Sequence, residues 1–400
     1  MTLAQRVHAL LGDRATVEAG AGPLRVAPRN EDALALLMQT ASDARWSVAV
    51  AGAGTWMPPG APADIVVTTT HLCEASFASP SDLVVTAGAG LSWDTLRAEL
   101  AERGAWVAVD PPGKGRSVGS VLATGTAGPL RGGYGNVRDH VLGLTMVTGD
   151  GRVLRPGGIV VKNVAGFDLP KLATGSFGAF GIVTSVALRL RTVPRADLTL
   201  VGSGARDELV AAAREVLARG LTPAALELTS PSALAKPDWG VAVRLTGSDT
   251  EVAATRDAVR GAAGMDLPEL GAREAALFWQ SLHAGPLSGV TTIRLGALPS
   301  SLGCVFDLVA HHLREAWTTA SVAAGGIRWS GTADPGELRL LRHAAAQQEI
   351  PLTIERAPWA VRAALGHFGA YREGAGSLVL GLRNAFDPAG VLVAPLGIET

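Results

Sequence analysis

The chain has 400 residues, which are too many for one ordinary hydrophobic core, so we expect two domains. Charged residues make up 18% of the chain, against about 25% in typical soluble proteins, and the formal net charge is −1. Because the sequence has no basic stripe interleaved with aromatic residues, nucleic acid is not expected as a partner.

The N-terminal part predicts a small α/β unit. Asn30 is a good N-cap and two acidic residues follow it, which predicts a helix that ends near residue 42. A second helix should begin at Ser92 and stop at Gly104, a favoured residue after a helix end. Strands are expected at 46–51, 64–69 and 83–87. From 117 to 191, short strands and glycine turns predict a more antiparallel α+β unit.

The segment 192–197 is the best candidate for a domain boundary, because a strand ends there in proline and charge. Beyond it, strands and amphipathic helices alternate. The order strand-helix-strand-strand-helix over 198–263 predicts a split βαβ layer of the ferredoxin-like kind. Further helices are expected at 302–317 and 337–347. No internal repeat is recognisable in the residues themselves.

A glycine loop, 52–60, follows the predicted strand at 46–51. Gly52 and Gly54 suggest a dinucleotide-binding fingerprint, but Met57 stands where its third glycine belongs, and two prolines then prevent a helix. The pair Gly88 and Gly90 fails the same test. Two interpretations of 52–60 stay open: a row of backbone N–H groups that holds a phosphate, or a plain turn between strands.

A second loop, 110–125, begins with two prolines that fix an extended entry. Ser117 and Ser120 supply hydroxyl groups beside Gly119, although a surface loop of small residues would look alike. The turn at 134–139 follows, in which Arg138 and Asp139 are interpreted as a structural ion pair.

Other chemistries are poorly supported. Residues 174–178 lack the first glycine of a nucleophile elbow. His311 and Glu315 would share one face of the helix expected at 302–317, but no third ligand is evident, so no metal site is predicted.

Taken together, the glycine-rich segments resemble the vanillyl-alcohol oxidase/p-cresol methylhydroxylase family of FAD-dependent oxidoreductases, and within it the FAD-binding subunits of glycolate oxidases. The motifs that carry the resemblance are 134–139, 149–151, 161–169 and 175–184, with 382–391 near the C-terminus. The resemblance implies an α+β fold: a two-part FAD-binding domain of the p-cresol methylhydroxylase type at 1–195, a mixed-sheet cap or substrate domain at 196–375, and a C-terminal helix and tail at 376–400 that pack back on the first domain.

The same resemblance implies which residues contact FAD. No histidine lies in the glycine loop, so the cofactor is expected to be bound non-covalently. The implied cofactor-binding residues are Ala51, Gly52, Ala53, Gly54, Thr55, Trp56, Pro111, Ser117, Val118, Gly119, Ser120, Thr124, Gly125, Tyr134, Gly135, Asn136, Ile182 and Val183.

Lys162 and Asn163 are the catalytic candidates. Reduced flavin carries negative charge around N1 and the C2 carbonyl, so a nearby cation or amide donor favours hydride acceptance at N5. Lys162 is one of four lysines in the chain and lies among valines. The alternative is a lysine at a strand end that reaches solvent.

One expected feature is missing. Catalytic 2-hydroxy-acid dehydrogenases of this family carry a metal-binding histidine segment near the C-terminus, and nothing in 196–400 matches it. We therefore expect an FAD-containing subunit of a complex that oxidises a small 2-hydroxy acid such as glycolate and passes electrons to partner flavoprotein and iron–sulfur subunits. Two alternatives remain: a self-sufficient flavoenzyme in which Lys162, Arg244 or Arg294 holds a carboxylate, and a scaffold with a degenerate flavin site.

Cellular location is inferred from what the sequence lacks. Cys73 and Cys304 lie far apart without metal-type spacing, which favours a reduced compartment. No stretch of 18 apolar residues is present, and the N-terminus does not resemble a secretory signal. A cytoplasmic protein with no membrane span is expected.

Overall fold

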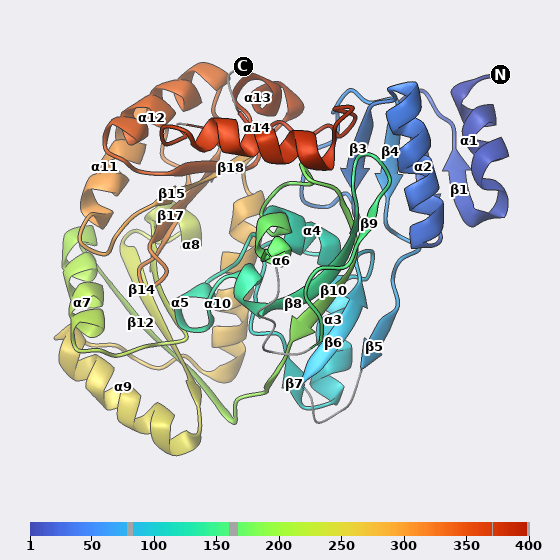
Figure 1. Cartoon of the computed structure of the whole chain (residues 1–400). Helices are drawn as coiled ribbons and strands as arrows, with labels where there is room; N and C mark the ends of the chain where they lie inside the picture. The colour runs from blue at the N-terminus through green and yellow to red at the C-terminus, as the bar shows by residue number, and fades with distance from the viewer. Residues whose placement is uncertain (78–82, 160–166, 370, 398–400) are drawn as a thin grey trace.

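The computed structural model describes residues 1–77, 83–159, 167–369 and 371–397. Helices and sheets are mixed throughout, so the fold is α+β, as predicted. A four-stranded, a five-stranded and a small two-stranded sheet come from the first half of the chain, and one large sheet comes from the second half (Figure 1).

The first sheet has four strands and carries the two N-terminal helices. Its order is β1 (Ala15–Glu18), β2 (Leu24–Pro28), β4 (Ile65–Thr68) and β3 (Val48–Ala51), with β2, β4 and β3 parallel and β1 antiparallel to β2. Apolar side chains of α1 (Leu3–Leu11) and α2 (Glu31–Ala44) pack on it. The predicted N-cap of α2 is present, since Asn30 Oδ1 accepts a hydrogen bond from the N–H of Ala33 at 2.9 Å.

The second sheet has five antiparallel strands. Its order is β5 (Ala75–Phe77), β6 (Val84–Gly88), β10 (Ile182–Arg189), β8 (Val141–Val147) and β9 (Val153–Leu154). The short strands β7 (Ala105–Trp106) and β11 (Arg191–Thr192) pair beside it. Its helices are α3 (Trp93–Glu102), α4 (Val118–Thr124), α5 (Arg131–Tyr134) and α6 (Leu169–Ala173).

The third sheet has seven antiparallel strands. Its order is β12 (Ala196–Gly204), β14 (Trp239–Gly247), β13 (Ala225–Thr229), β16 (Trp317–Ser321), β17 (Gly326–Gly331), β15 (Thr291–Gly296) and β18 (Leu352–Arg356). Its helices are α7 (Arg206–Ala218), α8 (Pro231–Leu234), α9 (Asp249–Ala263), α10 (Ala272–Ala284), α11 (Leu302–His312), α12 (Pro335–Gln347) and α13 (Trp359–Leu365).

The topology of this sheet contains a repeat that the residues do not reveal. The unit β12-α7-β13-β14-α9 is a split βαβ, as predicted, and β15-α11-β16-β17-α12-β18 has the same order. The two units meet where β13 pairs with β16. An antiparallel bridge between Leu200 and Glu269 stands where a fourth strand of the first unit would lie. What repeats is the order and pairing of the strands. Different residues can form the same backbone hydrogen bonds, so the sequence need not repeat.

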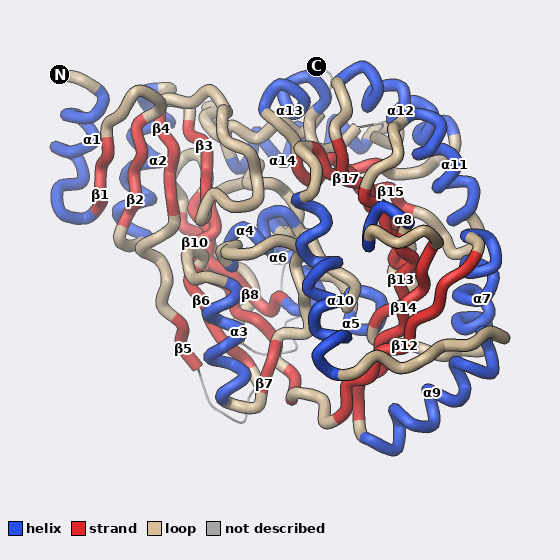
Figure 2. Tube along the Cα trace, turned by 180° about the vertical axis from the view of Figure 1, so that it is seen from behind, coloured by secondary structure: helices blue, strands red, loops and turns tan. Residues whose placement is uncertain are grey.

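The two faces of the large sheet have different neighbours. The helices α7, α9, α11 and α12 cover the outer face and form its main core (Figure 1). Side chains alternate between the faces along a strand, so Leu226 and Leu228 enter this outer core. Ala225 belongs instead to a smaller cluster with Trp279 of α10, on the inner face (Figure 2). The inner face is therefore the surface that meets the first half of the chain.

The C-terminal segment returns to the first two sheets. The last helix, α14 (Ala375–Phe386), leads to a stretch in which Val391 and Val393 exchange backbone hydrogen bonds with Val48 of β3. Asp387 is buried and accepts the N–H groups of Val391 and Leu392. On the basis of these contacts we propose the division 1–195, 196–375 and 376–400. Within the described part of the chain, no helix has the length and apolar character needed to cross a membrane.

Candidate functional site

The glycine loop after β3 packs directly against the start of α4. A Cβ on Gly52 would overlap with the Oγ of Ser117, so only glycine allows this approach. Thr55 Oγ1 donates a hydrogen bond to the carbonyl of Gly115 at 3.0 Å. The two loops that sequence reasoning assigned to the cofactor, 51–56 and 111–125, therefore meet.

The glycine loop has the donors that a phosphate needs. The backbone N–H groups of residues 53–56 find no acceptor among the described residues. Gly54, with φ of 70° and open space around its Cα, turns the chain there. Successive N–H groups of this kind form an anion-binding concavity. These observations fit the diphosphate of FAD.

The backbone N–H groups at the start of α4 are already hydrogen-bonded. The N–H groups of Val118 and Gly119 already donate to the carbonyls of Leu91 and Ala89, and that of Ser120 donates to Ser117 Oγ. Any contact of this segment with a cofactor must therefore use side chains or carbonyl groups, because its amides are occupied.

Arg116 is a buried cation beside the glycine loop, and sequence reasoning missed it. Its guanidinium donates to Thr124 Oγ1 at 2.6 Å and to the carbonyl of Ser120 at 3.1 Å, and lies 4.4 Å from the ring centre of Trp56. Its Nε has no partner among the described residues. Burial lowers the pKa of Arg116 to about 9, so it is charged at neutral pH. A buried positive charge here favours a bound phosphate.

The glycine loop is also tied to the large sheet. The indole Nε1 of Trp56 donates to the carbonyl of Glu355 in β18 at 3.0 Å, and Arg356 Nε donates to the carbonyl of Trp56 at 2.9 Å. Arg362 donates to the carbonyl of Pro58 at 2.9 Å. No local pattern predicts these contacts, because about 300 residues separate the partners.

The remaining predicted cofactor residues hold the loops and sheets together. Tyr134 pairs its hydroxyl with Thr246 Oγ1 of β14 at 2.6 Å. The N–H of Asn136 donates to Asp139 at 2.8 Å. Ile182 is fully buried in the core of the first sheet. The remaining positions, Gly125, Gly135 and Val183, lie at a helix end, in the 134–139 turn and in β10.

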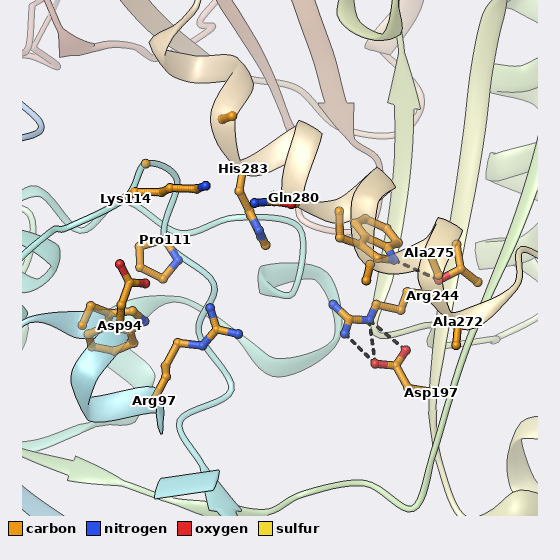
Figure 3. Close-up of a pocket in the computed structure, with 16 residues that line it drawn as sticks. Asp94, Arg97, Pro111, Lys114, Asp197, Arg244, Ala272, Ala275, Gln280 and His283 are labelled. Carbon is orange, nitrogen blue, oxygen red and sulfur yellow. Dashed lines mark hydrogen bonds and ion pairs between the residues drawn. The ribbon is translucent and has the colours of Figure 1, made fainter. Parts of the chain in front are cut away.

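A cavity of about 470 Å³ lies between α3, the segment 111–114 and α10 (Figure 3). Figure 3 shows Arg97 and Lys114 extending from one wall of the cavity and Arg244 lying on the opposite wall. The side chain of His283 extends into the cavity from α10. Its floor includes Pro111, one of the predicted cofactor residues. Small side chains of α10 leave the space open: Ala272, Ala275, Ala276 and Ala284.

Some of the charged side chains in this cavity form ion pairs and others do not. Arg244 pairs with Asp197, whose hydrogen bonds outweigh the effect of burial and raise the pKa of Arg244. Arg97 and Lys114 form no ion pair with any residue that the structure describes. Asp94 also lines the cavity and accepts the N–H of Gly115 at 3.0 Å, so its carboxylate offsets part of this positive charge and a small excess of cations faces an anionic ligand.

His283 and Asp110 form a dyad at the cavity. The carboxylate of Asp110 is buried and accepts the N–H of Leu130 at 3.2 Å on each oxygen. Its Oδ2 lies 3.0 Å from His283 Nε2, which donates to it. The N–H of Gly113 donates to the carbonyl of His283 at 2.9 Å, which fixes the end of α10. In this tautomer His283 Nδ1 is left to accept a proton.

Arg294, the other arginine considered as a carboxylate holder, lies in a separate buried cluster. Its Nε donates to Glu355 Oε1 at 2.9 Å, and Arg328 Nε donates to Glu355 Oε2 at 2.7 Å. Burial alone would raise the pKa of Glu355, but Arg328 and Arg294 hold it at about 2. Arg328 also donates to the carbonyl of Ala127 at 3.0 Å.

Two of the residue pairs singled out in the sequence have different outcomes in the structure. Lys162 and Asn163 lie outside the described residues, so their role stays a prediction. The shared helix face of His311 and Glu315 is wrong: α11 ends at His312, and Glu315 accepts a hydrogen bond from Ser232 at 2.6 Å in the loop before β16. The described residues contain no cluster of three His, Cys, Asp or Glu side chains that can hold a metal ion.

Comparison with known proteins identifies the first half of the chain. Residues 23–157 match the family described as FAD binding domain. Glycolate oxidase subunit GlcE of Escherichia coli is 34% identical over 272 residues, which cover 66% of this chain and 70% of that protein. Glycolate oxidase subunit GlcD of Bacillus subtilis is 31% identical over 54% of this chain and 47% of its own length.

Two more distant relatives match this chain in sequence or in fold. The mitochondrial D-lactate dehydrogenase [cytochrome] of Arabidopsis thaliana is 29% identical over 44% of this chain and 31% of its own length. The solved structure of an alkyldihydroxyacetonephosphate synthase superposes with a TM-score of 0.70 over 93% of this chain and 77% of that one, at 14% identity. At that identity the superposition establishes the fold alone. The chain thus belongs to the family of FAD-binding oxidoreductases that includes glycolate oxidase subunit GlcE, and its cofactor is FAD.

Proposed function

We propose that this protein is an FAD-dependent dehydrogenase subunit that oxidises a small 2-hydroxy acid such as glycolate. In this proposal FAD is bound non-covalently and the electrons pass to partner flavoprotein and iron–sulfur subunits. The names of its relatives, glycolate oxidase subunits and D-lactate dehydrogenases, support the substrate class and a multi-subunit assembly.

The observation that carries the proposal is the 470 Å³ cavity beside the cofactor loops. It combines two cations that form no ion pair with the described residues, Arg97 and Lys114, with the carboxylate of Asp94 and with a histidine held by a buried carboxylate. A 2-hydroxy acid needs both features: a cation for its carboxylate and an acceptor for its hydroxyl proton. Pro111 and Gly113 belong both to the cavity wall and to the loop assigned to the cofactor.

Each residue has a defined task in this proposal. Bound FAD would accept the hydride that leaves the substrate carbon. Arg97 and Lys114 bind the carboxylate, and His283 Nδ1 accepts the hydroxyl proton. Asp110 stabilises the resulting imidazolium through Nε2, as a carboxylate does for the histidine of a catalytic triad. The FAD diphosphate is assigned to the N–H groups of 53–56 and to the positive charge of Arg116.

The test is an anaerobic titration of the purified chain with glycolate and with D-lactate, followed by visible absorbance. The proposal expects a yellow protein whose flavin band bleaches with a hydroxy acid, either alone or after its partner subunits are added. Steady-state turnover by the isolated chain, without partner subunits, supports the self-sufficient alternative. A yellow protein that no hydroxy acid bleaches, with or without partners, contradicts the substrate class.

A further inference from the structure

The glycine loop 52–60 does not hold its own shape. Among the described residues, no backbone–backbone hydrogen bond involves any of residues 53–60. Pro58 and Pro59 have no N–H to donate, and Gly54 can adopt many backbone conformations. An isolated segment of this composition would sample many shapes, so the arrangement of its N–H groups must be fixed by contacts from outside the loop.

Trp56 is a point at which the second half of the chain holds this loop. It is 3% exposed, and its indole Nε1 donates to the carbonyl of Glu355 in β18. Arg356, the next residue of β18, returns a hydrogen bond from its Nε to the carbonyl of Trp56, and its Nη1 donates to the carbonyl of Gly289 at 2.6 Å. The side chain and the backbone of Trp56 are thus both fixed by β18.

Arg362 of α13 holds the loop two residues further along the chain. It is buried, its Nη2 donates to the carbonyl of Pro58, and its Nε donates to the carbonyl of Ala357 at 2.9 Å. The same helix packs beside the end of the loop, since a Cβ on Gly60 would lie 3.7 Å from the Cβ of Trp359. Arg356 and Arg362 therefore each join a loop carbonyl to a carbonyl of the second half.

The same two arginines bring positive charge to the loop. Neither Arg356 nor Arg362 forms an ion pair with any residue that the structure describes. Burial lowers the pKa of Arg356 and lowers that of Arg362 to about 10, and no neighbouring carboxylate offsets this effect. Both guanidinium groups remain charged at neutral pH. Because a buried charge without a counter-ion is unfavourable, an anion bound at the loop stabilises both of them. The FAD diphosphate is such an anion.

We propose that Arg356 and Arg362 are positioning residues for cofactor binding, which hold the glycine loop in the shape that receives the FAD diphosphate. FAD then binds tightly only when the two halves of the chain are docked. Bound FAD in turn favours docking, because the coupling between two equilibria is reciprocal. This inference rests on the proposed assignment of the diphosphate to residues 53–56 and is independent of the substrate.

The first experiment titrates the full-length apoprotein with FAD and obtains the dissociation constant from the change in flavin fluorescence. Arg356→Gln and Arg362→Gln should each raise this constant about tenfold, since each variant removes a charge-assisted hydrogen bond to the loop. Arg362→Lys keeps the charge and a donor, so it should restore part of the affinity. Arg339→Gln, at an exposed position on α12, is the control and should bind FAD like wild type. Wild-type affinity in both glutamine variants overturns the proposal.

A double-mutant cycle with Gly52→Ala separates positioning of the loop from a general loss of stability. If Arg356 acts through the loop, Arg356→Gln should weaken FAD binding less in the Gly52→Ala background, where the loop is already displaced, than in wild type. Equal effects in the two backgrounds overturn the proposal. Full FAD affinity in Gly52→Ala alone would refute the assignment of the diphosphate to this loop. A loss in Gly52→Ala without any loss in the arginine variants would refute only the role of the arginines.

Hydrogen exchange of the wild-type protein tests the coupling without any variant. FAD added to the apoprotein should slow amide exchange in residues 352–365, which form β18 and α13, because the occupied loop favours the docked arrangement. Exchange in α9, which covers the outer face of the large sheet, is the internal control and should not change. Equal exchange of residues 352–365 with and without FAD overturns the proposal.

Discussion

Gly52 and Ser117 touch with no space between them. A Cβ on Gly52 would overlap with the Ser117 side-chain oxygen and lie 3.3 Å from Ser117 Cβ. The loop after β3 and the start of α4 are thereby fixed relative to each other. The proposed binding site for the FAD diphosphate thus depends on the absence of one side chain.

Gly52→Ala should separate these two segments and weaken FAD binding at least tenfold. Overpacking of a tight contact costs about 1–3 kcal/mol, and the displaced loop no longer presents its N–H groups together. The FAD-to-protein ratio after gel filtration, with a titration of the apoprotein, measures the effect. Gly22→Ala is the control, because nothing lies within 4 Å of a Cβ there. Full FAD occupancy in Gly52→Ala would contradict the assignment.

Arg97→Gln should raise the KM for the hydroxy acid about tenfold and change kcat by less than about twofold. A cation that binds the carboxylate equally in the ground and transition states affects KM alone. Steady-state kinetics with the fully assembled enzyme measures both constants. Arg273→Gln removes the same charge from an exposed position on α10 outside the cavity and should change neither constant. A selective loss of kcat in Arg97→Gln would assign it another role.

His283→Gln should lower the rate of flavin reduction by a factor of about 10²–10⁴, the usual contribution of a positioned base. FAD content should not change, since the role proposed for the dyad is in substrate oxidation and not in cofactor binding. Stopped-flow bleaching under anaerobic conditions, at saturating hydroxy acid, measures this step. His343→Gln, on the exposed face of α12, is the control. A variant that bleaches at the wild-type rate would exclude His283 as the proton acceptor.

Local patterns predicted local structure well. The N-cap of α2, the glycine loop and the split βαβ order depend on neighbouring residues, and the structure contains all three. The hydrogen bond from Trp56 to Glu355 joins residues 299 positions apart, and the second βαβ unit repeats a hydrogen-bonding pattern without repeating residues. Neither leaves a local signal. The helix expected at 302–317 was too long, because the chain leaves the helix after His312 and enters β16 at Trp317.

Glu227→Gln should flatten the dependence of stability on pH. The pKa of Glu227 is about 8 in the folded protein, against an ordinary 4.5, so the folded state holds a proton that the unfolded state has lost between these values. This stabilising contribution is full below pH 4.5 and is lost as the pH rises to about 8.

Urea unfolding at pH 5, 7 and 8.5 measures the effect. Wild type should lose on the order of a few kcal/mol more than Glu227→Gln between pH 5 and 8.5. Glu373→Gln, at an exposed position, serves as the control and should follow wild type. Parallel pH profiles for Glu227→Gln and wild type would mean that Glu227 is ionised in the folded protein.

Lys162→Ala should lower the midpoint potential of the bound flavin, because a cation near N1 and the C2 carbonyl stabilises the negative charge of the reduced form. A shift on the order of 30 mV is expected, equivalent to about 1.4 kcal/mol for a two-electron couple. Spectroelectrochemical titration of the purified protein measures it. Lys171→Ala is the matched control, since Lys171 is exposed and pairs with Asp168 at 2.8 Å. If both variants keep the wild-type potential, Lys162 does not act on the flavin.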